Sequence, residues 1–178
     1  MKSLKKFLKY LVRIQNRITV TIMLIIPIMV FIQVLLRYVF KAPLMGIEEL
    51  LLFPTIWLYM LGGAMASEKR SHITCGILIL YIKTEKGMNI FNIIKAFFAS
   101  ITSLWLTYWA FWYFSYSLRM WKYSAILSAP MFFAESAIFI GLVLMTFYSI
   151  YELYERLTNF RIKYLQKAGV DDANNSTT

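Results

Sequence analysis

The chain has 178 residues, of which 60% are hydrophobic and 17% aromatic, while only 16% are charged. A soluble domain of this size has a larger charged fraction, so the composition indicates a membrane protein. The formal net charge of +10 does not indicate nucleic-acid binding, because the basic residues are divided among separate segments rather than gathered on one soluble face.

Four stretches without charged side chains divide the chain, at residues 18–36, 50–67, 96–118 and 136–151. A helix needs about 20 residues to cross the roughly 30 Å hydrocarbon layer, and the last stretch reaches that length only together with residues 130–135. We therefore predict an all-α membrane protein with four transmembrane helices, at about 18–40, 48–67, 93–118 and 130–151. They form one integral membrane domain, residues 1–168, and residues 169–178 form a disordered cytoplasmic tail.

The basic residues predict how the spans are oriented. Six Lys or Arg residues precede the first span, five lie around the connection between the second and third spans, and four follow the fourth, whereas the other two loops hold four in total. Under the positive-inside rule, both termini are expected in the cytoplasm. The single cysteine, Cys75, then faces the reducing side of the membrane and forms no disulfide within the chain.

The segment from Lys2 to Arg17 combines basic and apolar residues at helical spacing. We expect an amphipathic interfacial helix on the inner leaflet, where its charges attract anionic lipids; a solvated basic arm and a specific docking element are the alternatives. Between the second and third spans, residues 73–82 are apolar but only about 15 Å long as a helix, too short to cross the membrane. They are expected to form a second interfacial segment.

The first two spans are joined by a short loop with charge on both sides. Arg37 closes the first span, and Glu48 and Glu49 open the second, so opposite charges meet at one membrane face. We predict that Arg37 pairs with one of the two glutamates as a structural latch, although helix-end electrostatics alone would also favour these charges here. Gln33, one turn before Arg37, is expected to bond either another helix of the bundle or a partner subunit.

Two further spans carry patterns typical of contact surfaces. The second span has small residues spaced four apart, Gly62 with Ala66 and Gly63 with Ser67, which predicts close packing of another helix. The third has aromatic residues at steps of four, three and four: Trp105, Trp109, Trp112 and Tyr116. This stripe runs from the outer end toward the middle of the membrane, so it is predicted to contact a larger partner or bound lipid, with an interfacial aromatic belt as the alternative.

The fourth span is expected to open with Ser128 as an N-cap and Pro130 in the first turn. Glu135 lies roughly 8 Å beyond Pro130 by helical rise. A carboxylate at this depth is either solvated near the helix start or binds a proton or cation.

Chemistry that requires clustered ligands is missing from the sequence. One histidine cannot form a bis-histidine haem site, and His72 with Cys75 alone does not complete a zinc site. We expect no enzymatic activity, and no cofactor or metal, in this chain. A self-sufficient secondary transporter usually has internal repeats and broken helices around a central site, so the chain is expected to act with a partner.

Residues around the first hairpin carry a family resemblance. They are Arg37, Tyr38, Val39, Phe40, Pro43, Leu44, Glu48, Glu49, Trp57, Leu61, Gly62, Gly63, Ala64, His72 and Ile73, with Pro130 and Gly141 near the last span. In order and spacing they resemble the small membrane subunit of tripartite ATP-independent periplasmic (TRAP) transporters, the DctQ type. The sequence departs from the family pattern at Gly46, Gly76, Phe132 and Phe139, where Trp, Asp, Trp and Pro are common.

The resemblance implies a four-helix subunit of the bacterial inner membrane that scaffolds a larger, multi-span membrane subunit. The larger subunit would carry an organic acid together with sodium, supplied by a soluble periplasmic binding protein, and this chain would bind no substrate. Lys41, Arg119 and Lys122, in the outer loops, are candidates for docking the periplasmic protein.

Two other functions also suit four spans. A membrane anchor of a respiratory complex would bind haem or quinone, and its purified form would show a Soret band. A small homo-oligomeric exporter would depend on Glu135, and a Glu135→Gln variant would then abolish transport by the isolated protein.

Overall fold

The computed structural model describes residues 2–41, 45–69 and 85–175. These residues form four helices, α1 (Lys2–Tyr38), α2 (Met45–Glu68), α4 (Glu85–Met120) and α5 (Phe132–Asn175). In the described part, each helix contains a segment long and apolar enough to cross a membrane: Leu8–Tyr38, Gly46–Glu68, Gly87–Met120 and Phe132–Lys163. The predicted all-α membrane protein with four spans is therefore confirmed.

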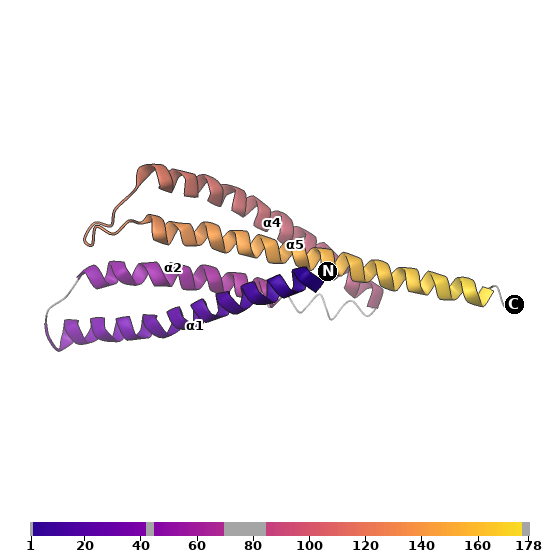
Figure 1. Cartoon of the computed structure of the whole chain (residues 1–178), viewed down its shortest axis with the longest axis horizontal. Coiled ribbons are helices and arrows are strands. Elements are labelled where there is room, and N and C mark those ends of the chain that lie inside the picture. Colours follow the sequence, from indigo (N-terminus) through magenta and orange to yellow (C-terminus); the bar gives the residue numbers. More distant parts are fainter. Residues whose placement is uncertain (1, 42–44, 70–84, 176–178) are drawn as a thin grey trace.

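The helices form a bundle in which α2 and α5 pack against each other (Figure 1). α1 packs on α2, and α4 packs on α5, so α1 and α4 are the outer helices. The C-terminal end of α1, the start of α2 and the α4–α5 loop lie at the same end of the bundle, and α5 extends past the other helices at the opposite end. Short connections between helices make sequential neighbours antiparallel, as the hairpin pattern predicts.

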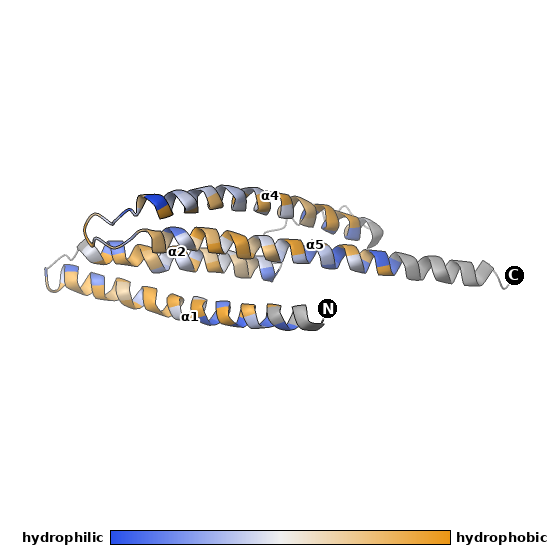
Figure 2. Cartoon of the chain, turned by 45° about the horizontal axis from the view of Figure 1, so that its top comes forward, coloured by the Kyte–Doolittle hydropathy of each residue, from blue (hydrophilic) through white to orange (hydrophobic). Residues whose placement is uncertain are grey.

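Much of the apolar surface of the bundle is exposed. A small buried cluster of Leu8, Ala64 and Tyr148 lies between α1, α2 and α5. In contrast, Phe31 on α1 is 63% exposed and Trp105 on α4 is 66% exposed, and Figure 2 shows apolar residues along most of α1 after its N-terminal turns. Contiguous exposed apolar surface of this extent is typical of contact with lipid or with another protein.

The start of α1 differs from the prediction. The amphipathic segment is not a helix separate from the first span, because α1 runs unbroken from Lys2 to Tyr38. No proline precedes Pro27, and two residues of this segment, Leu8 and Gln15, are buried in contact with other helices. The basic turns are therefore the first part of one continuous, packed helix.

Two other helix ends also differ from the predicted boundaries. α1 ends at Tyr38 because the Val39 and Phe40 amides both donate to the Leu35 carbonyl, at 2.9 and 3.3 Å. Ser128 does not cap the fourth span, since its φ is 52° and its amide donates to the Ser124 carbonyl within the loop. α5 accordingly begins at Phe132.

Two segments predicted to lie in the cytoplasm or at its membrane surface remain to be compared with the structure. The predicted interfacial segment, residues 73–82, and Cys75 within it lie outside the described residues. At the other end, α5 remains helical to Asn175, into the segment expected to be a disordered tail. No proline follows Pro130, so nothing of that kind breaks the helix.

Candidate functional site

The first hairpin is held by a hydrogen bond rather than by the predicted ion pair. Gln33 Nε2 donates to Glu48 Oε1 at 3.0 Å, joining α1 to α2. Among the described residues Arg37 forms no ion pair with Glu48 or Glu49; its guanidinium carbon lies 6.0 Å from the centroid of the Tyr38 ring. Glu48 lies one turn inside α2, at the level of Gln33, whereas Arg37 is exposed in the last turn of α1. The expectation that Gln33 bonds another helix of the bundle is confirmed.

Glu49 holds the loop between α4 and α5. Its carboxylate accepts hydrogen bonds from Ser124 Oγ, from the Ile126 amide at 3.2 Å and from the Leu127 amide at 3.0 Å. These donors lie 75 to 78 residues away in the sequence. Glu49 therefore fixes the α4–α5 loop, which lies outside the α1–α2 hairpin.

Gly46 lies against the same loop. A Cβ atom at this position would lie only 2.6 Å from Leu127 Cδ1, the end of a flexible side chain. A larger residue here would therefore require Leu127 to change its rotamer.

Replacing Glu49 with Gln is expected to loosen the α4–α5 loop. The substitution removes the negative charge that strengthens three hydrogen bonds, and charge-assisted bonds are stronger than neutral ones. Hydrogen exchange at the Ile126 and Leu127 amides should become several-fold faster. A Glu48→Gln variant is the matched control, because its hydrogen-bonding partner in the described part is Gln33. Equal exchange in the two variants would contradict the assignment.

A buried polar junction joins three helices at the other end of the bundle. Gln15 Nε2 of α1 donates to the Leu61 carbonyl of α2 at 2.9 Å, and the Tyr148 hydroxyl of α5 donates to Gln15 Oε1 at 2.9 Å. Gln15 is 4% exposed and Tyr148 3% exposed. The sequence pattern did not predict this site because Gln15 lies among basic residues, although an uncharged amide between Arg13 and Arg17 is a signal that could have revealed it.

Polar side chains also join α4 to α5. The Thr107 and Thr146 hydroxyls lie 2.8 Å apart, and Thr107 Oγ1 donates to the Leu142 carbonyl at 3.2 Å. Nearer the α4–α5 loop, the Tyr113 hydroxyl donates to Glu135 Oε1 at 2.9 Å. Glu135, the residue on which an exporter would depend, thus has a partner within the chain.

The small residues of α2 divide between two faces. Gly63 and Ser67 face α5: a Cβ at Gly63 would overlap the Met145 side chain, and Ser67 Oγ lies 3.4 Å from Ser149 Oγ. A Cβ at Gly62 would meet no atom within 4 Å, and Ala66 is partly buried. Close packing of a helix of this chain therefore involves Gly63 and Ser67 rather than Gly62.

The predicted aromatic stripe points away from the bundle. The exposed fractions are 66% for Trp105, 58% for Trp109, 61% for Trp112 and 43% for Tyr116. All four side chains therefore remain available to lipid or to another protein.

Three basic residues lie at or just beyond the C-terminal ends of α1 and α4: Lys41 after α1, Arg119 in the last turn of α4 and Lys122 in the loop that follows. All three are exposed. Lys122 Nζ lies 4.9 Å from the centroid of the Tyr116 ring, close enough for a cation–π contact.

The fold and these contacts define a class: a four-span helical membrane protein whose polar side chains within the spans mainly bond its own helices. Residues 26–159 match the family described as tripartite ATP-independent periplasmic transporters, DctQ component. Because this match covers most of the chain, the protein belongs to the DctQ family. The family is one of transporter subunits, not of enzymes.

A relative from Haemophilus influenzae is similar over part of its length. It is described as "Putative TRAP transporter small permease protein" and is 30% identical over 79 residues, which are 44% of this chain and 47% of the relative. The matched region thus spans about half of that relative.

Proposed function

We propose that this chain is the small permease subunit of a TRAP-type transporter and holds a larger, multi-span membrane subunit steady in the bilayer. The larger subunit would carry an organic acid or related anion, driven by a sodium gradient, and a periplasmic binding protein would deliver the substrate. The chain would reside in the bacterial inner membrane with both termini in the cytoplasm. DctQ membership and the uneven distribution of basic residues support this assignment.

The scaffolding role rests on a single observation: polar side chains within the spans bond other helices of the same chain. Gln15, Gln33, Thr107 and Glu135 are each hydrogen-bonded to another helix of the chain. In the described part, Ser117 Oγ is the buried side-chain oxygen or nitrogen without a partner. A substrate or ion site near the middle of a membrane needs several polar groups pointing at the ligand, and these groups serve the bundle instead.

The outward faces of α1 and α4 supply surface for a partner. We propose that Trp105, Trp109 and Trp112 of α4 contact the larger subunit or lipid held between the subunits. Trp side chains bury a large apolar area and are enriched among the residues that dominate interfaces. In this view the exposed stripe is covered in the assembled transporter.

Co-purification in mild detergent tests this role. The wild-type chain is expected to bring a larger multi-span membrane protein with it, and changing the three tryptophans together to Ala should lower the recovered partner about tenfold, as expected for loss of interface hot spots. A matched control replaces Met23, Leu24 and Phe31, on the exposed face of α1, with Ala. If the control loses the partner and the Trp variant keeps it, the contact lies on α1. Organic-acid accumulation by vesicles containing this chain alone would contradict scaffolding.

We also propose that Lys41, Arg119 and Lys122 dock the periplasmic binding protein. Exposed cations of this kind mainly accelerate association with an oppositely charged surface. Replacing all three with Ala should slow uptake at limiting binding-protein concentration and reduce its dependence on ionic strength. Unchanged uptake and salt dependence would remove this proposal, while leaving the scaffolding role in place.

A further inference from the structure

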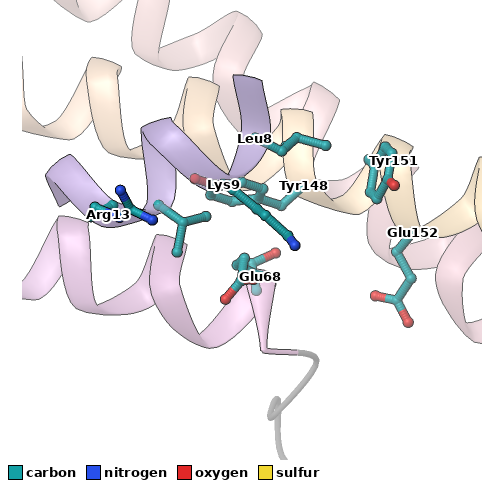
Figure 3. A pocket seen from close by; sticks show the side chains of 9 residues that line it. Leu8, Lys9, Arg13, Glu68, Tyr148, Tyr151 and Glu152 are labelled. Atoms are coloured by element: carbon teal, nitrogen blue, oxygen red, sulfur yellow. The ribbon is translucent and has the colours of Figure 1, made fainter. Parts of the chain in front are cut away.

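A pocket of about 470 Å³ opens between α1, α2 and α5, beside the C-terminal end of α2 (Figure 3). Its volume falls in the range of about 300–1,000 Å³ typical of small-molecule sites. Glu68 is the last residue of α2, and Glu152 is the first charged residue after the apolar stretch of α5. The pocket therefore lies where the spans end, at the depth of lipid headgroups.

Three charged side chains of the pocket have no ionic or hydrogen-bonding partner in the described part of the chain. Lys9 and Arg13 lie four residues apart on α1, and Glu68 lies opposite them on α2 (Figure 3). Like charges at this helical spacing repel each other, which favours an anion beside them. The fourth charge, Glu152, is bound to Arg156 at 2.6 Å.

The pocket walls combine apolar and hydroxyl-bearing side chains. Leu8 and Val12 supply apolar surface, and Ser67, Tyr148 and Tyr151 supply hydroxyl groups. The pocket therefore places an apolar wall beside charged groups where the spans end, which suits a molecule with a polar head and apolar chains.

We propose that the pocket binds the headgroup of one aminophospholipid of the phosphatidylethanolamine type. The phosphate lies between Lys9 and Arg13, and the primary ammonium group donates to the Glu68 carboxylate. Basic pockets between transmembrane helices are known to hold phospholipid headgroups, and the added carboxylate selects a headgroup that also carries N–H donors. Bound lipid would join α1 to α2 and α5 below the Gln15 junction. The proposal does not depend on the identity of the larger subunit.

Lipid retention by the purified full-length chain tests the site. The chain in detergent is mixed in turn with phosphatidylethanolamine, phosphatidylcholine and phosphatidylglycerol of equal chain length, and retained lipid is counted by native mass spectrometry. Phosphatidylethanolamine should be retained roughly tenfold better than phosphatidylcholine, because the quaternary ammonium of phosphatidylcholine has no N–H to donate to the charged Glu68 carboxylate. Equal or better retention of phosphatidylglycerol would overturn the proposal, since it would indicate general attraction of anionic lipid.

Variants separate the two halves of the headgroup. Lys9→Ala with Arg13→Ala should abolish tight retention of both zwitterionic lipids, whereas Glu68→Gln should remove the preference for phosphatidylethanolamine and leave phosphatidylcholine retention unchanged. Arg17→Ala is the matched control, because Arg17 is an exposed basic residue of α1 outside the pocket. Circular dichroism checks that each variant keeps its helices. A loss with Arg17→Ala equal to that of the double variant, or an unchanged preference with Glu68→Gln, would overturn the site.

Discussion

Replacing Gly141 with Ala is expected to destabilise the bundle by about 1–3 kcal/mol, the usual cost of forcing extra atoms into a packed core. A Cβ atom at Gly141 would lie 2.6 Å from Met60 Cβ and 3.3 Å from the Met60 backbone. These atoms belong to α2 itself rather than to the end of a flexible side chain, so α2 and α5 must move apart. The free energy of unfolding, measured by titration with a denaturing detergent, should fall accordingly.

Two other glycines of the same interface region serve as controls. At Gly63 the added methyl would meet the end of the Met145 side chain, which can change its rotamer, so Gly63→Ala should cost less than about 1 kcal/mol. At Gly62 nothing lies within 4 Å, and Ala is the better helix former by up to about 1 kcal/mol. Gly62→Ala should therefore be neutral or stabilising. Similar losses at all three positions would contradict a close approach of α2 and α5 at Gly141.

Replacing Gln15 with Leu is expected to release α1 from α2 and α5 and to lower stability by about 1–3 kcal/mol. The change removes two interhelical hydrogen bonds, each contributing about 0.6 kcal/mol on average and up to about 1.7 within a membrane. It also leaves the buried Tyr148 hydroxyl without its acceptor, which adds a desolvation cost. The detergent titration measures this loss, and Thr21→Val is the control, because the Thr21 hydroxyl bonds the Arg17 carbonyl of its own helix.

A double-mutant cycle gives the sharper measurement at this junction. Tyr148→Phe alone should also lower the free energy of unfolding. Added to Gln15→Leu it should lower that free energy little further, because the Tyr148 hydroxyl that Gln15→Leu leaves without an acceptor is then absent. The two losses should therefore be clearly non-additive. Additive losses would show that the two side chains stabilise the bundle independently.

The first hairpin shows which contacts of a site a residue pattern can predict and which it cannot. Opposite charges at the ends of two neighbouring helices predicted that Arg37 pairs with either Glu48 or Glu49. Glu48 does contact α1, but through Gln33 rather than through Arg37. The pattern could not predict that Glu49 turns to the α4–α5 loop, because adjacent residues on a helix point about 100° apart. Which of two neighbours faces which element depends on the rotation of α2 within the bundle. In the described part of the chain, Arg37 forms no ion pair with either glutamate.

The sequence alone determined the class of protein and its four spans, since apolar length and charge placement are properties of continuous segments and need no tertiary contact. It also contained the resemblance that the family match bears out. The tertiary structure decided which groups the polar side chains bond. Gln15 bonds the backbone carbonyl of Leu61, 46 residues away, and the hydroxyl of Tyr148, 133 residues away. Those partners depend on how closely and at what rotation the helices pack. Gly141 allows the close approach of α2 and α5 at Met60, and the spacing of small residues along α2 did not reveal it because Gly141 lies on the other helix.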